Sequence, residues 1–296
     1  LADADGGKIK IEVASKISGG KVEKYKPFYL IVARERIDPY LCYRTLYPGY
    51  ESWGEMKIIQ RSLEDFKESS LAENQLLEDN CINCHSFIQN KPDRFLIHVR
   101  GSKAGTYFVD DNKVIRRELK LQNLPGNAVY PAWHPSGMYI AFSSNKIYSV
   151  IHMRPEKNIE LYDRSSMLVL YNIEKNEISV CGENDLAEYM VTYPFWSPDG
   201  KYLYFCRTKK VKPGFDLRQI KYDLVSMSFD QETELFDKPM VIIDSNETNK
   251  SVSFPSISPN GQYLVFTLQD YGTFPNWHNE ADLYLYDLNK GRLTRM

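Results

Sequence analysis

The chain has 296 residues, which is enough for one large β domain with a smaller module beside it. Aromatic residues make up 13% of the chain, and this share favours packed strands over disorder. A formal net charge of -2, without a long basic run, disfavours a nucleic-acid-binding protein. No apolar stretch approaches the ~20 residues of a membrane span. Because the chain starts at Leu1, we expect a processed or trimmed N-terminus, from which any export signal or lipid anchor would have been removed.

Residues 1–50 are predicted to form an N-terminal β-module and a connection. Lys8 to Val13 alternates between charged and apolar residues, a pattern typical of a half-buried strand. Pro27 to Ala33 is more uniformly apolar and indicates a second, more buried strand after the break at Ser18-Gly19-Gly20.

Residues 51–94 are predicted to form a short helical segment that leads into a cysteine motif. Trp53 to Leu77 is rich in Glu, Lys, Leu and Ser, and its apolar residues recur at roughly helical spacing. We expect a helix in two pieces that ends at Asp79-Asn80.

The motif that follows, Cys81-Ile82-Asn83-Cys84-His85, has the C-x-x-C-H spacing of c-type haem attachment. In that chemistry the thiols of Cys81 and Cys84 bind one porphyrin edge, and His85 is the proximal ligand of the iron. Two other interpretations stay open: a structural or redox disulfide, and half of a metal site that lacks its partner pair.

A haem also needs a wall and a group on its far side. His98, on a strand predicted over Arg94 to Val99, is the nearest candidate for a distal ligand or pocket residue. His134, and His152 with Met153, are further candidates, whereas His278 lies in a late loop. For each of them the competing interpretation is a hydrogen-bonded histidine of the core.

Residues 95–296 are predicted to form β-propeller blades. Residues 105–121 indicate a hairpin that completes most of a first blade together with Phe95 to Val99. One stretch then occurs three times in the sequence. The leading prolines of successive copies are 63 and 61 positions apart. The copies are Tyr130 to Phe142, Tyr193 to Phe205 and Phe254 to Phe266.

Each copy contains a Pro-polar-Gly turn, such as Pro198-Asp199-Gly200, followed by an apolar strand. Trp133 and Trp196 precede their turns and are expected to pack between neighbouring units. His134 replaces the serine of the other copies, so we expect it to cap its turn. With the strands that follow, each period supplies four antiparallel strands, as in a propeller blade.

The P-x-W-S-P-D-G-K-x-L/I-x-F core resembles the WD-like repeats of TolB-type β-propellers, over roughly Val129 to Met296. The run Asn80 to Phe87, followed by Phe95 to Gly101 and Ala104 to Phe108, resembles the haem-motif segment of a Bacteroidetes-type exported propeller family. This resemblance implies a periplasmic or cell-surface location, with or without a lipid anchor, and supports haem. It does not imply a particular reaction.

The predicted fold is thus all-β: a propeller with about four blades visible, and a small N-terminal β-module. Four blades are the minimum for a closed ring, and a further copy would begin beyond Met296. N-terminal strands or another chain could complete the ring, but we favour a piece of a longer five- or six-bladed propeller.

Two functions remain open from the sequence. The first is an exported haem c protein that transfers electrons to a redox partner or senses redox state or haem in the cell envelope. The second is a non-catalytic propeller that binds an envelope protein or acts as a scaffold, with its cysteines incidental or disulfide-linked. Cys42, Cys181 and Cys206 are odd in number, and nothing selects a pair.

The sequence contains no hydrolase or transferase motif, since G-x-S-x-G, H-E-x-x-H and the phosphate-binding glycine patterns are all missing. Calcium is equally unsupported, because Asp270 and Asp282 do not have the spacing of a ligand loop.

Overall fold

The computed structural model describes residues 7–32, 37–46, 54–111, 113–119, 121–154, 157–212, 214 and 216–296. Trp53, where the predicted helical segment begins, lies outside these residues. The chain divides into two compact units, one of Leu1–Tyr43 with Ile59–Ser69 and one of Arg44–Ile58 with Ser70–Met296.

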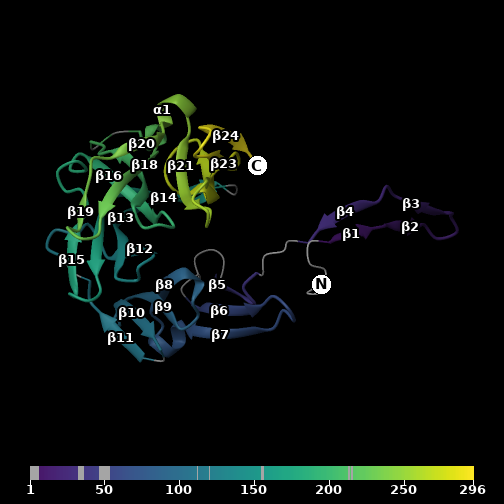
Figure 1. Cartoon of the computed structure of the whole chain (residues 1–296), viewed down its shortest axis with the longest axis horizontal. Coiled ribbons are helices and arrows are strands. Elements are labelled where there is room, and N and C mark those ends of the chain that lie inside the picture. Colours follow the sequence, from purple (N-terminus) through teal and green to yellow (C-terminus); the bar gives the residue numbers. More distant parts are fainter. Residues whose placement is uncertain are drawn as a thin grey trace. The chain divides into compact units, whose positions relative to one another are not determined.

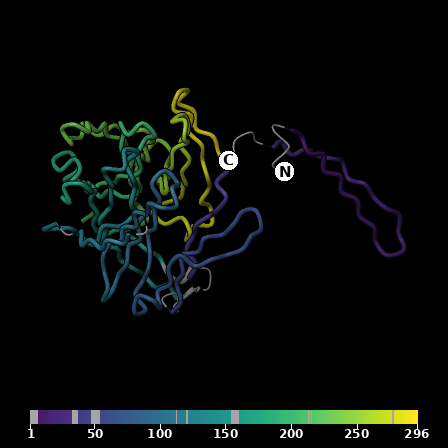
Figure 2. The backbone as a smooth tube through the Cα atoms, turned by 60° about the horizontal axis from the view of Figure 1, so that its bottom comes forward, coloured from purple at the N-terminus to yellow at the C-terminus, as the bar shows by residue number. Residues whose placement is uncertain are grey.

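The N-terminal strands form a two-stranded antiparallel ribbon, drawn in purple in Figures 1 and 2. Strand β1 (Lys8–Ile11) pairs with β4 (Phe28–Ile31), and β2 (Ala14–Lys16) pairs with β3 (Val22–Lys24). The chain reverses at Gly19, whose φ of 79° lies in the left-handed region that glycine adopts without strain. Both predicted strands are therefore present, although Ala33 lies outside the described residues. The second strand was expected to be the more buried one, and this is wrong, because every residue of β4 is exposed.

The helical prediction for Trp53 to Leu77 is wrong over most of its length. Strands β5 (Tyr40–Leu46), β6 (Met56–Ser62) and β7 (Glu68–Glu73) form a three-stranded sheet, and only the 3-10 turn η2 (Asn74–Leu77) is helical. Met56 and Ile58 are buried while Lys57 and Ile59 are only half-buried. This alternation has the period of a strand, although the composition of the segment favours a helix.

Four further sheets follow in chain order. The first contains β8 (Cys81–Phe87), β9 (Arg94–Arg100), β10 (Gly105–Asp110) and β11 (Lys113–Arg117). The second contains β12 (Ala128–Trp133), β13 (Tyr139–Arg154), β14 (Lys157–Asn172) and β15 (Glu177–Val180). The third contains β16 (Tyr189–Trp196), β17 (Tyr202–Lys209), β18 (Asp223–Asp230), β19 (Leu235–Phe236) and β20 (Met240–Ile243). The last contains β21 (Ser251–Ile257), β22 (Tyr263–Gln269), β23 (Asp282–Asp287) and β24 (Arg292–Arg295). The connections carry the short helical turns η3 (Ile88–Asn90), η4 (Leu217–Gln219), α1 (Ser245–Thr248) and η5 (Pro275–Trp277).

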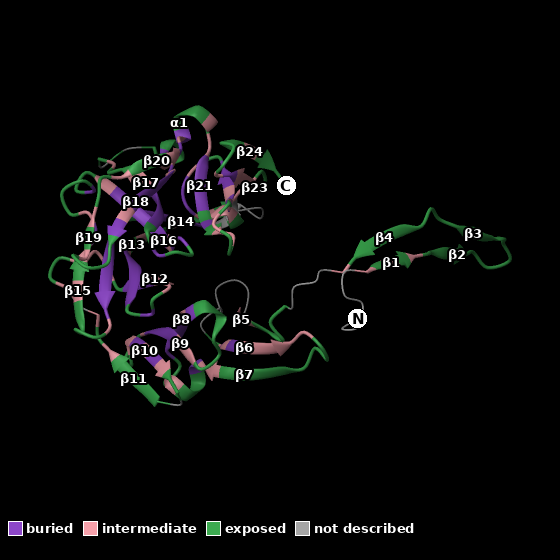
Figure 3. Ribbon diagram, viewed as in Figure 1, coloured by how far each residue is buried: buried purple, intermediate pink, exposed green. Residues whose placement is uncertain are grey.

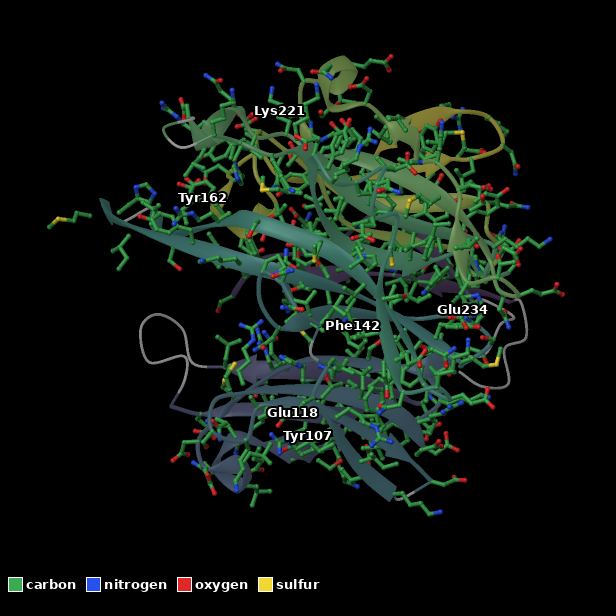
Figure 4. All side chains as sticks on the ribbon, turned by 90° about the vertical axis from the view of Figure 1, so that its left-hand side faces the viewer. Tyr107, Glu118, Phe142, Tyr162, Lys221 and Glu234 are labelled. Atoms are coloured by element: carbon green, nitrogen blue, oxygen red, sulfur yellow. The ribbon has the colours of Figure 1, made fainter. Side chains whose placement is uncertain are left out.

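These sheets are propeller blades whose first strands, β8, β12, β16 and β21, lie side by side in succession. Apolar clusters fill the spaces between consecutive blades, and Figure 3 shows burial concentrated on their inner strands. Phe142 on β13, labelled in Figure 4, is fully buried in the cluster between the first two of these blades. The predicted propeller fold is confirmed.

The first four-stranded blade begins at Cys81 and not at Phe95. Strand β8 pairs with β9 from Cys81 opposite Arg100 to Phe87 opposite Phe95. The cysteine motif is consequently the inner strand of a blade, and the boundary expected between residues 94 and 95 falls inside β9.

The repeated tryptophans join neighbouring blades, as the sequence predicts. The indole Nε1 of Trp133 donates to the carbonyl oxygen of Ser86 at 3.1 Å, and that of Trp196 donates to Ala132 at 3.1 Å. His134 caps its own turn, because its Nδ1 accepts from the backbone N–H of Ser136 at 3.1 Å. Its Nε2 also lies 3.0 Å from the carbonyl oxygen of Gly200, in the turn of the next blade.

This contact between turns predicts different costs for two glycine substitutions. Gly200 and Gly261 occupy the same turn position, with φ of 73° and 70°. Apart from the adjacent residues of the chain, a Cβ at Gly261 would come no closer than 3.9 Å to any atom, whereas one at Gly200 would lie 2.3 Å from His134 Nε2. We expect Gly261→Ala to lose about 1 kcal/mol of unfolding free energy through backbone strain alone. Gly200→Ala should lose at least about 1 kcal/mol more unfolding free energy than Gly261→Ala, because its Cβ would overlap the His134 ring. Denaturant unfolding of both variants measures the difference, and equal losses would contradict the contact between Gly200 and His134.

Candidate functional site

A backbone irregularity recurs at the same place on all four inner strands. Each has a β-bulge, and its extra residue adopts a positive φ that is uncommon for a residue other than glycine. These residues are Cys84 (φ 42°), Tyr130 (φ 50°), Tyr193 (φ 54°) and Phe254 (φ 47°). The residues that follow them are His85, Pro131, Pro194 and Pro255.

The last two residues of the C-x-x-C-H motif therefore occupy the place of the aromatic-proline pair in the three repeats. Together these eight residues line one cavity of about 270 Å³, which we call the central cavity. Cys84 and His85 were predicted as site residues, and they do share a site. Sequence reasoning missed Tyr130, Tyr193 and Phe254, although all three stand at the start of the repeats. Phe87 could have revealed this equivalence, because it is an aromatic residue that precedes a turn and an apolar strand, as Trp133 and Trp196 do.

The aromatic residues of the central cavity contact one another in series. The ring of Tyr193 meets that of Tyr130 edge-on at 4.7 Å between centroids and stacks on that of Phe254 at 4.4 Å. The Tyr193 hydroxyl donates to the carbonyl oxygen of Thr273 at 3.1 Å, and this bond fixes its ring. Phe254 is 46% exposed, so one end of the series faces solvent.

The two cysteines of the motif differ in their surroundings. Cys84 lines the central cavity, whereas Cys81 is buried and does not belong to its lining. Burial raises the pKa of both thiols above the usual value, and Arg100 and Arg44 offset only part of this shift. Both groups are therefore protonated at neutral pH and are weak nucleophiles. All five cysteines carry free thiols, with Cys181 and Cys206 buried in the blades.

His98 lies on the other side of the sheet from the residue it was predicted to oppose. It pairs with Asn83, whereas His85 pairs with Ile97, and adjacent residues of a strand point to opposite faces. The His98 Nδ1 lies 3.3 Å from the Thr106 hydroxyl, and burial with the nearby Arg100 lowers its pKa to about 4. It lines a separate cavity of about 220 Å³.

The other candidate histidines also lie elsewhere. His134 holds its turn, and His152 Nε2 lies 2.9 Å from Glu160 Oε2 while Met153 is fully exposed. His278 contacts the ring of Tyr271 at 4.5 Å between centroids. The structure brings none of them to His85.

A covalently bound haem requires two thiols and an imidazole at one face of the chain. In the extended strand β8, Cys84 and His85 reach the central cavity and Cys81 does not. Among the described residues, no three His, Cys, Asp or Glu side chains form a group that could hold a metal ion. As arranged here, the motif does not fit haem c. Haem attachment stays a prediction from the spacing.

A buried carboxyl group lies close to the aromatic residues of the central cavity. Asp163 Oδ1 accepts from Asn145 Nδ2 at 2.9 Å, and its Oδ2 accepts from the Tyr222 hydroxyl at 3.4 Å. Within the described part of the chain, no cation pairs with it. Burial raises its pKa from 3.8 to about 6, and its charge contributes to the raised pKa of Tyr130 and Tyr193.

Comparisons with known proteins support the fold. No protein-family model and no curated protein matches the chain. Among solved structures, a TolB protein from Agrobacterium tumefaciens is similar at 16% identity, with a TM-score of 0.53 over 98% of this chain and 89% of the other. A puromycin-hydrolyzing peptidase from Mycobacterium tuberculosis is similar at 11% identity and a TM-score of 0.52, over 88% of this chain and 37% of the peptidase. A luciferin-regenerating enzyme is similar at 8% identity and a TM-score of 0.50, over 82% of this chain and 72% of the enzyme. At such identities the likeness shows a TolB-like propeller fold and nothing of an activity.

In the described part of the chain, no helix is long and apolar enough to cross a membrane.

The buried carboxyl group of Asp163 predicts a pH-dependent stability. Because its pKa is higher in the folded than in the unfolded protein, ionisation destabilises the fold as pH rises from about 4 through about 6. Above this range the cost approaches about 3 kcal/mol. Asp163→Asn keeps an acceptor for Asn145 and removes this cost. We expect the variant to be more stable than the parent at pH 8, with the gain shrinking towards pH 4. Thermal unfolding across this pH range measures the gain, and a gain independent of pH would contradict the assignment.

Proposed function

We propose that the protein is a non-catalytic TolB-like propeller that binds a segment of another protein in its central cavity. The observation that carries this proposal is the convergence of four equivalent two-residue units, one from each inner strand, on a single cavity. The TolB-like fold agrees with it, although the fold alone supports many functions.

The lining of the central cavity favours side chains of a protein over a free small molecule. Its volume of about 270 Å³ falls below the roughly 300–1,000 Å³ of typical small-molecule sites. Tyrosine, phenylalanine and proline offer rigid apolar contact area, and aromatic residues dominate the binding energy of protein interfaces. An apolar anchor from an extended peptide segment suits such a site.

We further propose that the protein is exported and that its partner is an envelope protein. The resemblance of the segment around Cys81 to an exported propeller family supports this location, and so does the TolB-like fold.

Covalent haem attachment is a separate proposal that rests on the C-x-x-C-H spacing alone. The protein should be produced with a c-type maturation system and assayed as the pyridine haemochrome, beside a Cys81→Ala, Cys84→Ala variant. A haemochrome in the parent that the variant lacks would support attachment and require β8 to leave its observed conformation. Equal absorbance in the two proteins would remove the haem proposal.

Site-specific cross-linking tests the binding function. A photoreactive residue replaces Phe254 in the central cavity or, as a control of similar exposure, Leu283 on β23, which is 52% exposed against 46% for Phe254. We expect irradiation in an envelope extract to give a discrete covalent adduct from position 254, at least about tenfold stronger than from position 283, because the partner segment fills the cavity. Equal adducts from both positions, or none from position 254, would contradict the proposed function.

A further inference from the structure

The N-terminal ribbon has two chemically distinct faces. Residues paired across antiparallel strands share a face, so Ile9 with Leu30 and Ile11 with Phe28 form an apolar face. Lys8 with Ile31 and Lys10 with Tyr29 form the opposite face. The ribbon therefore combines a continuous apolar strip with an array of cations and an aromatic ring.

Little of this apolar surface is covered. Phe28 and Leu30 are each 51% exposed, and Ile9 and Ile11 are half-buried. Further exposed apolar side chains lie along the ribbon: Val13, Ile17, Val22, Tyr25, Tyr29 and Ile31. A two-stranded ribbon is marginally stable in water without a surface to pack against, so exposed apolar residues on both faces indicate a missing partner.

The ribbon also carries a charge opposite to that of the whole chain. Residues 8–31 contain six lysines and two glutamates, a formal charge of +4, whereas the chain as a whole carries -2. The lysines are Lys8, Lys10, Lys16, Lys21, Lys24 and Lys26. An anionic surface is therefore the complementary partner.

We propose that this ribbon binds the surface of an anionic lipid bilayer. Protein interfaces are depleted of lysine, whereas elements that lie in a membrane interface combine lysines with aliphatic and aromatic side chains. The strip of Ile9, Ile11, Phe28 and Leu30 enters the boundary between headgroups and acyl chains. The lysines extend their ammonium groups back to the anionic headgroups, and Tyr25 and Tyr29 lie at headgroup level.

Vesicle co-sedimentation of the whole protein tests the proposal. Vesicles of equal parts phosphatidylglycerol and phosphatidylcholine should bind the protein, and vesicles of phosphatidylcholine alone should bind it at least about tenfold more weakly. Binding to the anionic vesicles should fall as salt rises, because salt screens the lysines. Equal binding to both vesicle types, or binding to neither, would overturn the proposal.

Charge variants locate the contact. Replacing Lys8, Lys10, Lys24 and Lys26 with glutamine should lower the partition onto anionic vesicles at least about tenfold, since each lysine near such a surface contributes to binding. The matched control replaces four exposed lysines of the blades and their loops, Lys201, Lys209, Lys212 and Lys238, and should change partition less than about twofold. The same loss in both variants would overturn the assignment to the ribbon.

Two further measurements complete the test. In Phe28→Trp, emission should shift to the blue on anionic vesicles beyond any shift of the parent, because the new indole leaves water. Light scattering without vesicles should give a monomer. A dimer that Phe28→Gln combined with Leu30→Gln abolishes would instead show that a second copy covers the apolar strip, and would overturn the membrane proposal.

Discussion

The inner-strand bulge is the constraint on which the site depends. A residue with positive φ interrupts the regular pairing of each inner strand and re-aims the two residues at that point. In three blades these two residues are an aromatic residue and a proline, whose fixed φ and missing N–H suit a point where the ladder is already broken. In the blade that begins at Cys81 they are Cys84 and His85, and Cys84 has the same positive φ as the aromatic residues. Four bulges of the same kind line the cavity. They carry three different residue pairs, which are Cys-His, Tyr-Pro and Phe-Pro.

This equivalence changes the meaning of the cysteine motif. Read as a linear pattern, it groups Cys81, Cys84 and His85 as one chemical unit. In the folded blade, Cys81 is a buried residue of the strand, and only Cys84 and His85 reach the cavity. Their neighbours there come from other blades, with Tyr130 beside Tyr193 and Phe254 beyond. The lining of the cavity runs across the blades, and the sequence shows its four parts as two unrelated patterns, the C-x-x-C-H motif and the start of the three repeats.

Features that depend on residues close together in the sequence could be predicted, whereas features that depend on distant residues could not. The turn around Pro198-Asp199-Gly200 is encoded within a few residues, so the repeats and the propeller fold could be predicted. The packing of Trp133 and Trp196 between blades followed from their place in the repeat. The strand at Met56 to Ser62 could not be recognised by composition, because partners from elsewhere in the chain outweigh its helical residues. Cys84-His85 could not be aligned with Tyr-Pro by residue type, since the two pairs share only the bulge and the positive φ of their first residue. The faces of His85 and His98 depend on strand register, which spacing along the chain does not reveal.

Hydrogen exchange with and without the protein that cross-links at position 254 tests the central claim most directly. If the central cavity is the binding site, the added protection should fall on residues around all four bulges, at Asn83–Phe87, Val129–Trp133, Thr192–Trp196 and Ser253–Ile257. The outer strands β11, β15 and β24 should exchange as before. Protection confined to outer strands or loops, with the four bulges unchanged, would contradict the account.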